Sequence, residues 1–176
     1  PRRTPMTPSH NQRWAAALVA GLCADGGVSD VVVSPGSRST PLALAFGGAQ
    51  VRAHVVLDER AAGFFALGLA RMSGRPVALL CTSGSAAGHY LPAVIEAAAS
   101  CVPLVVLTAD RPAELQSVGA AQTIDQVHLF GRHVRRAFHL DAPGAGDAGF
   151  LGTVAALALD AATSSPPGPV HINCPY

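Results

Sequence analysis

The sequence predicts an α/β fold, with one parallel sheet of about six strands and helices on both of its faces. Short β-branched runs alternate along the chain with longer Ala-rich amphipathic stretches, which is the order of parallel βαβ units. The predicted strands are almost wholly apolar rather than alternating, so helices should cover both faces of the sheet. The 176 residues are 49% hydrophobic and carry a net charge of +1, which suits one compact domain and disfavours disorder.

The first predicted element is a helix near the N-terminus. Its apolar residues recur at a helical spacing of four, at Trp14, Leu18 and Leu22. Ser9 or Asn11 offers an N-cap for it. Arginines ahead of residues 15–24 also fit a signal peptide, but the helical face favours a helix of the domain. Residues 1–8 contain three prolines and no apolar periodicity, so we expect a flexible leader there and a domain over 9–176.

The remaining elements alternate between strand and helix. The predicted strands are Asp30–Val33, Ala53–Leu57, Val77–Cys81, Leu104–Leu107, Val134–His139 and Val170–Ile172. The predicted helices are Thr40–Phe46, Glu59–Met72, Ser85–Ser100, Asp125–Phe130 and Asp147–Ala162. Gly144–Gly149 matches G-x-G-x-x-G, but it lies in the last βα unit rather than the first, so a flexible loop is the better interpretation than a dinucleotide site.

Composition excludes several classes of function. All 12 basic residues are arginine, which rules out Schiff-base chemistry and the phosphate-binding lysine of a Walker loop. With only 13% charged residues in near balance, a nucleic-acid surface is disfavoured. Glu96 and Pro103 interrupt the longest apolar run, so no membrane span is predicted. The four cysteines form no C-x-x-C and lie in apolar stretches, which predicts buried, reduced thiols in a cytoplasmic protein. The seven dispersed histidines predict no metal site built by this chain alone.

Polar residues follow four of the predicted strands. They form the segments Ser34–Arg38, Asp58–Arg60, Thr82–Ser85 and Thr108–Pro112. Carboxyl ends of parallel strands meet at one edge of a sheet, and ligands bind there, so this edge is the candidate site.

Each functional residue at this edge also has an ordinary structural interpretation. The turns at 36–39 and 83–85 fit either anion cradles or capped helix starts. Arg38 and Arg111 fit either bidentate carboxylate binding or surface ion pairs. Glu59 fits either a functional acid or a first-turn acid favoured by the helix dipole.

Seven motifs together carry a resemblance to a known family. They are N-x-R-W-A-A at 11–16, S-P-G-S-R-S-T-P-L at 34–42, D-E-R-x-x-G at 58–63, L-G-L-A at 67–70, T-S-G-S-A at 82–86, L-T-A-D-R-P at 107–112 and V-H-I-N-C-P at 170–175. The chain from residue 10 onward resembles the N-terminal, pyrimidine-binding domain of thiamine-diphosphate-dependent enzymes. S-P-G-S-R-S and T-A-D-R-P narrow the resemblance to the synthases of menaquinone biosynthesis.

This resemblance implies a transferase that decarboxylates 2-oxoglutarate and adds the succinyl unit to isochorismate. It makes Glu59 the catalytic residue, hydrogen-bonded to the aminopyrimidine ring of thiamine diphosphate. It implies cofactor contacts at Pro35, Gly36, Thr82, Ser83 and Gly84, and binding of the anionic substrates by Ser37, Arg38, Arg111 and Gln122.

The resemblance also implies parts that this sequence lacks. The family's Mg²⁺-diphosphate motif, G-D-G followed by Asn, belongs to a later domain and is absent here. We therefore expect residues 9–176 to be the first of three domains, inactive alone, in a cytoplasmic homodimer or homotetramer whose cofactor and Mg²⁺ are held mainly by the C-terminal domain.

The sequence departs from the family's motifs at two positions, and two alternative functions stay open. Ala121 stands where the family commonly has Asn, and His89 lies near where an Asn often follows the T-S-G turn. One alternative is the pyrimidine-binding subunit of a split thiamine-dependent 2-oxoacid decarboxylase. The other is a non-catalytic, ligand-binding α/β domain.

Overall fold

The predicted fold class is confirmed by the computed structural model, which describes residues 9–144 and 148–176. Over these residues six parallel strands form one sheet in the order β2-β1-β3-β4-β6-β5. The strands are β1 (Asp30–Val33), β2 (Arg52–Val55), β3 (Val77–Cys81), β4 (Leu104–Asp110), β5 (Ala137–His139) and β6 (Val170–Pro175). The expected leader, residues 1–8, lies outside the described residues.

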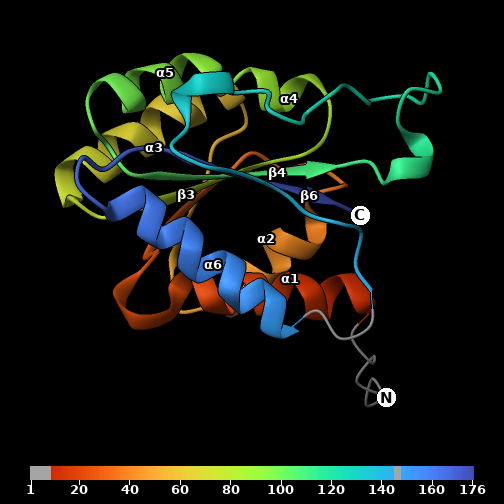
Figure 1. Ribbon diagram of the computed structural model, residues 1–176, viewed down its shortest axis with the longest axis horizontal. Coiled ribbons are helices and arrows are strands. Elements are labelled where there is room, and N and C mark those ends of the chain that lie inside the picture. Colours follow the sequence, from red (N-terminus) through yellow and green to blue (C-terminus); the bar gives the residue numbers. More distant parts are fainter. Residues whose placement is uncertain (1–8, 145–147) are drawn as a thin grey trace.

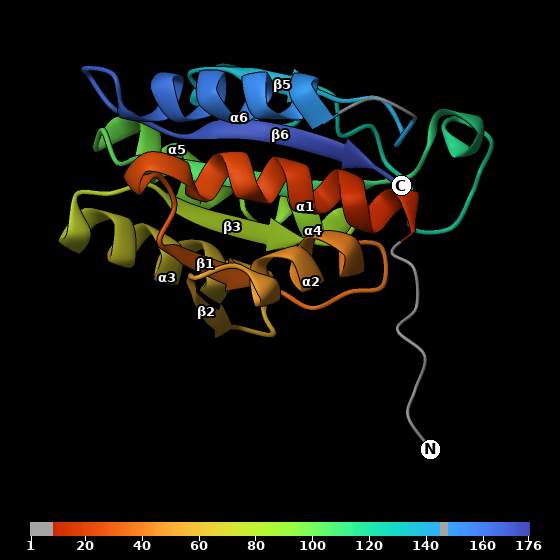
Figure 2. The same ribbon diagram turned by 90° about the horizontal axis from the view of Figure 1, so that it is seen from below.

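Helices lie on both sides of this sheet. They are α1 (His10–Cys23), α2 (Thr40–Gly48), α3 (Glu59–Ser73), α4 (Ser85–Gly88), α5 (Leu91–Ala99) and α6 (Ala148–Thr163), with short 3₁₀ turns at Ala24–Gly26, Ala113–Leu115 and Gly131–His133. Figure 1 shows α3, α4 and α5 above the sheet and α1, α2 and α6 below it. In Figure 2, α1 lies between α6 and α2.

Each face of the sheet has its own core. On the face covered by α1, α2 and α6, strand residues such as Leu80 and Leu107 pack against Leu18 and Phe46. On the opposite face, Leu79 and its strand neighbours pack against the small residues of α3 and α5. Gly63 of α3 belongs to this packing, because a Cβ there would lie 2.9 Å from the Cβ of Ala93. The central strands β3 and β4 are buried on both faces, as their apolar runs predict.

The edge strand β2 is an exception. Three of its four residues are exposed, so helices do not cover this strand on both sides. Its charged residues instead bond to β1, where Arg52 and His54 both contact the buried carboxylate of Asp30. An edge strand that carries charged side chains also resists pairing with other sheets.

The first helix begins where the sequence indicates. Ser9 is its N-cap: the Ser9 side chain accepts from the Gln12 backbone N–H at 3.2 Å, and the Ser9 N–H donates to Gln12 Oε1 at 2.7 Å. This reciprocal capping box satisfies two of the backbone donors that a helix start leaves open. Ser9, rather than Asn11, therefore sets the start of the helix.

Two predicted helices are wrong in detail. Residues 85–100 form two helices, because Pro92 lacks an N–H and α5 begins anew at Leu91. Residues 125–130 form turns rather than a helix, and His128 has a left-handed φ of 58°. The strand predicted from Val134 begins only at Ala137.

The expectation of four buried thiols holds for two of them. Cys81 and Cys174 are fully buried, and burial raises the pKa of both. Cys101 is exposed, at a turn where its φ is 55°. Among the described helices, none combines the length and apolar character needed to cross a membrane.

Candidate active site

Three turns converge at the carboxyl edge of the sheet. They follow β1 (residues 34–39), β3 (82–84) and β4 (111–126). The first two turns touch at Gly36, where an added Cβ would lie 2.7 Å from Cγ2 and 2.8 Å from Oγ1 of Thr82. This close approach explains why glycine occupies position 36. It brings four of the five predicted cofactor contacts (Gly36, Thr82, Ser83 and Gly84) into one surface, while Pro35 beside them is exposed.

The four residues predicted to bind substrate line one cavity. Ser37, Arg38, Arg111 and Gln122 enclose about 170 Å³ together with Asn11, Pro41 and Tyr176. Arg38 and Ser37 come from the turn after β1, whereas Arg111 and Gln122 come from the segment after β4. The geometry therefore brings the four predicted residues together.

The cavity is positively charged. Arg38 Nη1 donates to the backbone oxygen of Tyr176 at 2.5 Å, and Arg111 Nη2 donates to the carbonyl of Ala121 at 3.1 Å. The Arg111 Nε is buried without a hydrogen-bond partner. Burial and the nearby Arg111 charge lower the pKa of Arg38. Across residues 9–144 and 148–176, no carboxylate forms an ion pair with either guanidinium, which leaves both available to an anion.

Gln122 connects this cavity to the turn after β3. Its Nε2 donates to the Ser83 carbonyl at 3.1 Å and lies 3.3 Å from Thr82 Oγ1, while its own carbonyl accepts from Ser83 Oγ at 3.1 Å. Gln122 takes a left-handed φ of 57° to make these contacts. Because it bonds to residues 82–83 and also lines the arginine cavity, Gln122 couples the predicted cofactor turn to the predicted substrate residues.

Glu59 lies at the neighbouring part of the edge and does not line the arginine cavity. It is the first residue of α3, after Asp58, whose carboxylate caps the helix through the N–H of Arg60 at 2.9 Å. Glu59 is half-buried, and none of the described residues donates a hydrogen bond to its carboxylate. The carboxylate is therefore placed to accept a hydrogen bond from a ligand.

Buried groups that the sequence did not single out lie behind the turn after β1. The Tyr90 hydroxyl donates to the Leu80 carbonyl at 2.9 Å and lies 3.2 Å from Ser34 Oγ. Burial, Cys81 and Glu59 all raise the pKa of Tyr90, and burial followed by Glu59 raises that of Cys81. Both groups stay neutral near pH 7. Both side chains are fully buried, and no local sequence pattern marks Tyr90 for this position.

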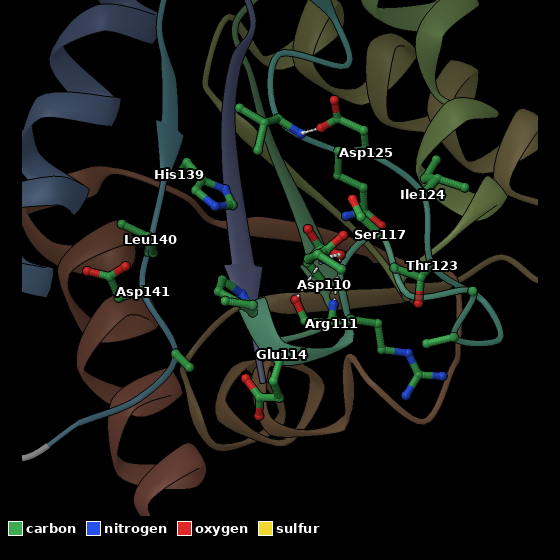
Figure 3. A pocket seen from close by; sticks show the side chains of 18 residues that line it. Asp110, Arg111, Glu114, Ser117, Thr123, Ile124, Asp125, His139, Leu140 and Asp141 are labelled. Carbon is green, nitrogen blue, oxygen red and sulfur yellow. Dashed lines mark hydrogen bonds between the residues drawn. The ribbon is translucent and has the colours of Figure 1, made fainter.

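A larger pocket, of about 590 Å³, shares Arg111 with the arginine cavity. Figure 3 shows His139, Leu140 and Asp141 on one side of it and Thr123 and Ile124 on the other. Its lining carries four carboxyls (Asp110, Glu114, Asp125 and Asp141) against the single guanidinium of Arg111, and this excess of carboxyls disfavours an anionic ligand. The smaller arginine cavity is therefore the better candidate for anionic substrates.

Two further features of the sequence analysis lie away from this cavity or outside the described residues. His89 is exposed at the end of α4. The G-x-G-x-x-G segment lies partly outside the described residues. In the part of the chain that the structure describes, no group of three His, Cys, Asp or Glu residues is arranged to hold a metal ion.

Comparison with known proteins places this geometry in a family. Residues 13–129 match the family model described as thiamine pyrophosphate enzyme, N-terminal TPP binding domain. Similar curated proteins include the 2-succinyl-5-enolpyruvyl-6-hydroxy-3-cyclohexene-1-carboxylate synthases of Geobacillus kaustophilus and Chloroflexus aurantiacus. The first is 55% identical over 93% of this chain and 29% of its own length, and the second is 54% identical over 93% and 28%. The chain thus spans about three tenths of the length of these relatives.

Proposed function

Because the chain belongs to the thiamine pyrophosphate enzyme family, as its N-terminal TPP binding domain, we propose that it is the first domain of a longer synthase. That longer protein, called here the whole enzyme, decarboxylates 2-oxoglutarate and adds the succinyl unit to isochorismate in menaquinone biosynthesis. The identity to synthases with the corresponding name supports this substrate assignment.

The observation that carries the proposal is the arginine cavity. Both proposed substrates carry carboxylates, and a guanidinium binds a carboxylate through two parallel hydrogen bonds. Arg38 and Arg111 present two guanidiniums to one small cavity, where the buried Arg111 Nε still lacks a partner. A carboxylate in this cavity would offset the repulsion between the two cations and satisfy that donor.

The residues at the edge also fit thiamine diphosphate. The half-buried Glu59 carboxylate offers an acceptor for a protonated ring nitrogen. When bound, the cofactor supplies a nucleophilic carbon and an electron sink for the loss of carbon dioxide. Glu59 would hold the proton at the ring nitrogen, and the turns at Gly36 and residues 82–84 would hold the ring.

We further propose that the diphosphate and Mg²⁺ are bound by another domain of the whole enzyme, contributed by a second subunit of a cytoplasmic homodimer or homotetramer. One face of α3 supports this assembly. Phe64 is 50% exposed and Met72 is 87% exposed, with the small Gly68 midway between them at helical spacing. Such an apolar stripe beside the site is suited to contact with a partner subunit.

The test is turnover of 2-oxoglutarate plus isochorismate, with thiamine diphosphate and Mg²⁺, by this chain and by the whole enzyme. We expect activity only in the whole enzyme, and we expect Glu59→Gln to lower it by about 10²- to 10⁴-fold because a proton-transfer partner is lost. The matched control is Glu96→Gln, the same chemical change at an exposed position on α5. Full activity of Glu59→Gln would remove the catalytic assignment. Decarboxylation that appears only with a separate partner chain would instead favour the split decarboxylase.

A further inference from the structure

We propose that Gln126 is a positioning residue that holds the turn formed by Thr82, Ser83 and Gly84 in place for cofactor binding. This inference rests on the proposed function. Gln126 is 1% exposed and does not line the arginine cavity, so it would act through the turn rather than by touching substrate. Its Oε1 accepts a hydrogen bond from the Gly84 N–H at 2.8 Å.

The other end of the Gln126 amide is anchored in the sheet. Its Nε2 donates to the Ala109 carbonyl of β4 at 3.1 Å and to Asn173 Oδ1 of β6 at 2.9 Å. These three bonds define the orientation of the amide, because a flipped amide would point its NH₂ at an N–H and its oxygen at two oxygens. Gln126 thereby joins the largely buried turn at residues 82–84 to two central strands.

The same network continues to the substrate side of the site. Asn173 Nδ2 donates to Asp110 Oδ2 at 2.7 Å, and Asp110 Oδ1 accepts from the Arg111 backbone N–H at 2.7 Å. Asn173 Oδ1 accepts from Gln126 Nε2 and from Thr108 Oγ1 at 2.7 Å, and the Gln126 NH₂ on one side with the Asp110 carboxylate on the other defines the orientation of the Asn173 amide. An unbroken path of hydrogen bonds therefore runs from the Gly84 N–H to the backbone of Arg111.

The turn needs this support because it has little structure of its own. Gly84 has a φ of 87° and a ψ of −150°, a conformation that residues with a side chain rarely adopt. The helix that follows is only four residues long, and Gly84 provides it with no side-chain cap. Without Gln126, the buried Gly84 N–H would lose its acceptor and could regain one only by moving toward water.

The experiment compares the whole enzyme with its Gln126→Met and Val154→Ala variants. Methionine keeps the length of the side chain but removes all three hydrogen bonds, whereas Val154 is a buried core residue on α6 that serves as a stability control. In the absence of ligand, hydrogen exchange measures the exchange rate of the Gly84 amide in each of the three proteins. Calorimetry then measures the Kd for thiamine diphosphate in the presence of Mg²⁺.

We expect Gln126→Met to speed exchange at Gly84 and to raise the Kd by about ten-fold, the equivalent of one hydrogen bond. Val154→Ala should change neither quantity. Faster exchange with an unchanged Kd would overturn the inference while leaving the proposed function intact, and so would unchanged exchange at Gly84. Failure of the unmodified whole enzyme to bind thiamine diphosphate would overturn both.

A second variant keeps the inference testable if Gln126→Met does not fold. In Gln126→Glu, the protonated carboxyl has both an acceptor for Gly84 and a donor for Asn173, whereas the ionised form turns a negative charge toward two oxygens. We therefore expect the ratio of its Kd for thiamine diphosphate to that of the unmodified enzyme to fall as the pH is lowered from about 8 to about 6. A Kd ratio that does not change with pH would count against the positioning role.

Discussion

Replacing Gly36 with alanine is expected to force apart the two turns that form the proposed cofactor surface. The new Cβ would lie 2.7 Å from Cγ2 of Thr82 and closer still to the Thr82 Cβ. Rotation about χ1 cannot move a Cβ, so the backbone of one turn must shift by about 1 Å to restore a normal carbon contact of about 3.5 Å. The φ of Gly36 is not in the left-handed region, so this contact, rather than backbone strain, causes the effect.

The expected magnitude follows from two opposing contributions. Overpacking of this kind costs about 1–3 kcal/mol, and the lower entropy of the unfolded alanine chain returns about 0.4–1 kcal/mol, so this chain should lose about 1–2 kcal/mol of unfolding free energy. In the whole enzyme, a displacement of about 1 Å at the cofactor surface should lower kcat/KM by up to about 10²-fold.

Urea unfolding of this chain, followed by the fluorescence of its single tryptophan, measures the free energy. Gly48→Ala is the matched control, because nothing lies within 4 Å of a Cβ at that position. Thr82→Gly removes the clashing atoms, so Gly36→Ala should cost much less in that background. Equal costs in both backgrounds, or a Gly36→Ala variant as stable as Gly48→Ala, would refute the reasoning.

Three further predictions follow from the site, the apolar stripe and the edge strand. In the whole enzyme, Arg111→Met should raise the KM for 2-oxoglutarate by about 10- to 100-fold, because a charge-assisted hydrogen bond is worth about 1.5–3 kcal/mol; an unchanged KM in steady-state kinetics would contradict its binding role. Phe64→Asp should shift the whole enzyme toward monomers in analytical ultracentrifugation, whereas Phe150→Asp, at a position that is 59% exposed on α6, should not. Equal effects of these two variants would argue against the α3 interface. Burial raises the pKa of Asp30, but hydrogen bonds from Arg52, His54 and Ser29 outweigh it and lower that pKa to about 2 from an ordinary value of 3.8. Since the folded state has the lower pKa, the stabilisation is present above about pH 4 and is lost as the pH falls toward 2, so Asp30→Asn should cost about 1–2 kcal/mol in urea unfolding at pH 7 and almost nothing at pH 2. A cost that is independent of pH would contradict this account.

The strands β1 and β3 were predictable because their sequence signal is local, whereas β4 and β6 each run three residues beyond the predicted end. Polar residues bound the apolar runs of β1 and β3, and these strands match the prediction to the residue. The break between α4 and α5 was missed because the alanine-rich pattern runs through it. Tyr90 lies within that break and is held by Leu80 and Ser34, which are distant in sequence.

The candidate site was predictable in part, for a similar reason. The rule that ligands bind at carboxyl ends of parallel strands placed Arg38 and Arg111 at one edge, and the structure brings both to one cavity. Tyr176 and Asn11 complete the cavity from remote segments that no local pattern connects to it. Gln126 was missed because its segment has no regular structure, and its partners Gly84 and Asn173 lie 42 and 47 positions away.

The distance in sequence between contacting residues also bears on how quickly the site can form. The hydrogen bond from Arg38 to Tyr176 closes a loop of 138 positions, and the rings of Trp14 and Tyr176 meet edge to face at 5.4 Å. Contacts across such separations form late, because the loop-closure entropy must be overcome before they contribute any stability. Trp14 is therefore a kinetic probe of the docking of β6, the strand through which β5 also joins the sheet. Its fluorescence change during refolding should mark the moment at which the arginine cavity acquires its final wall.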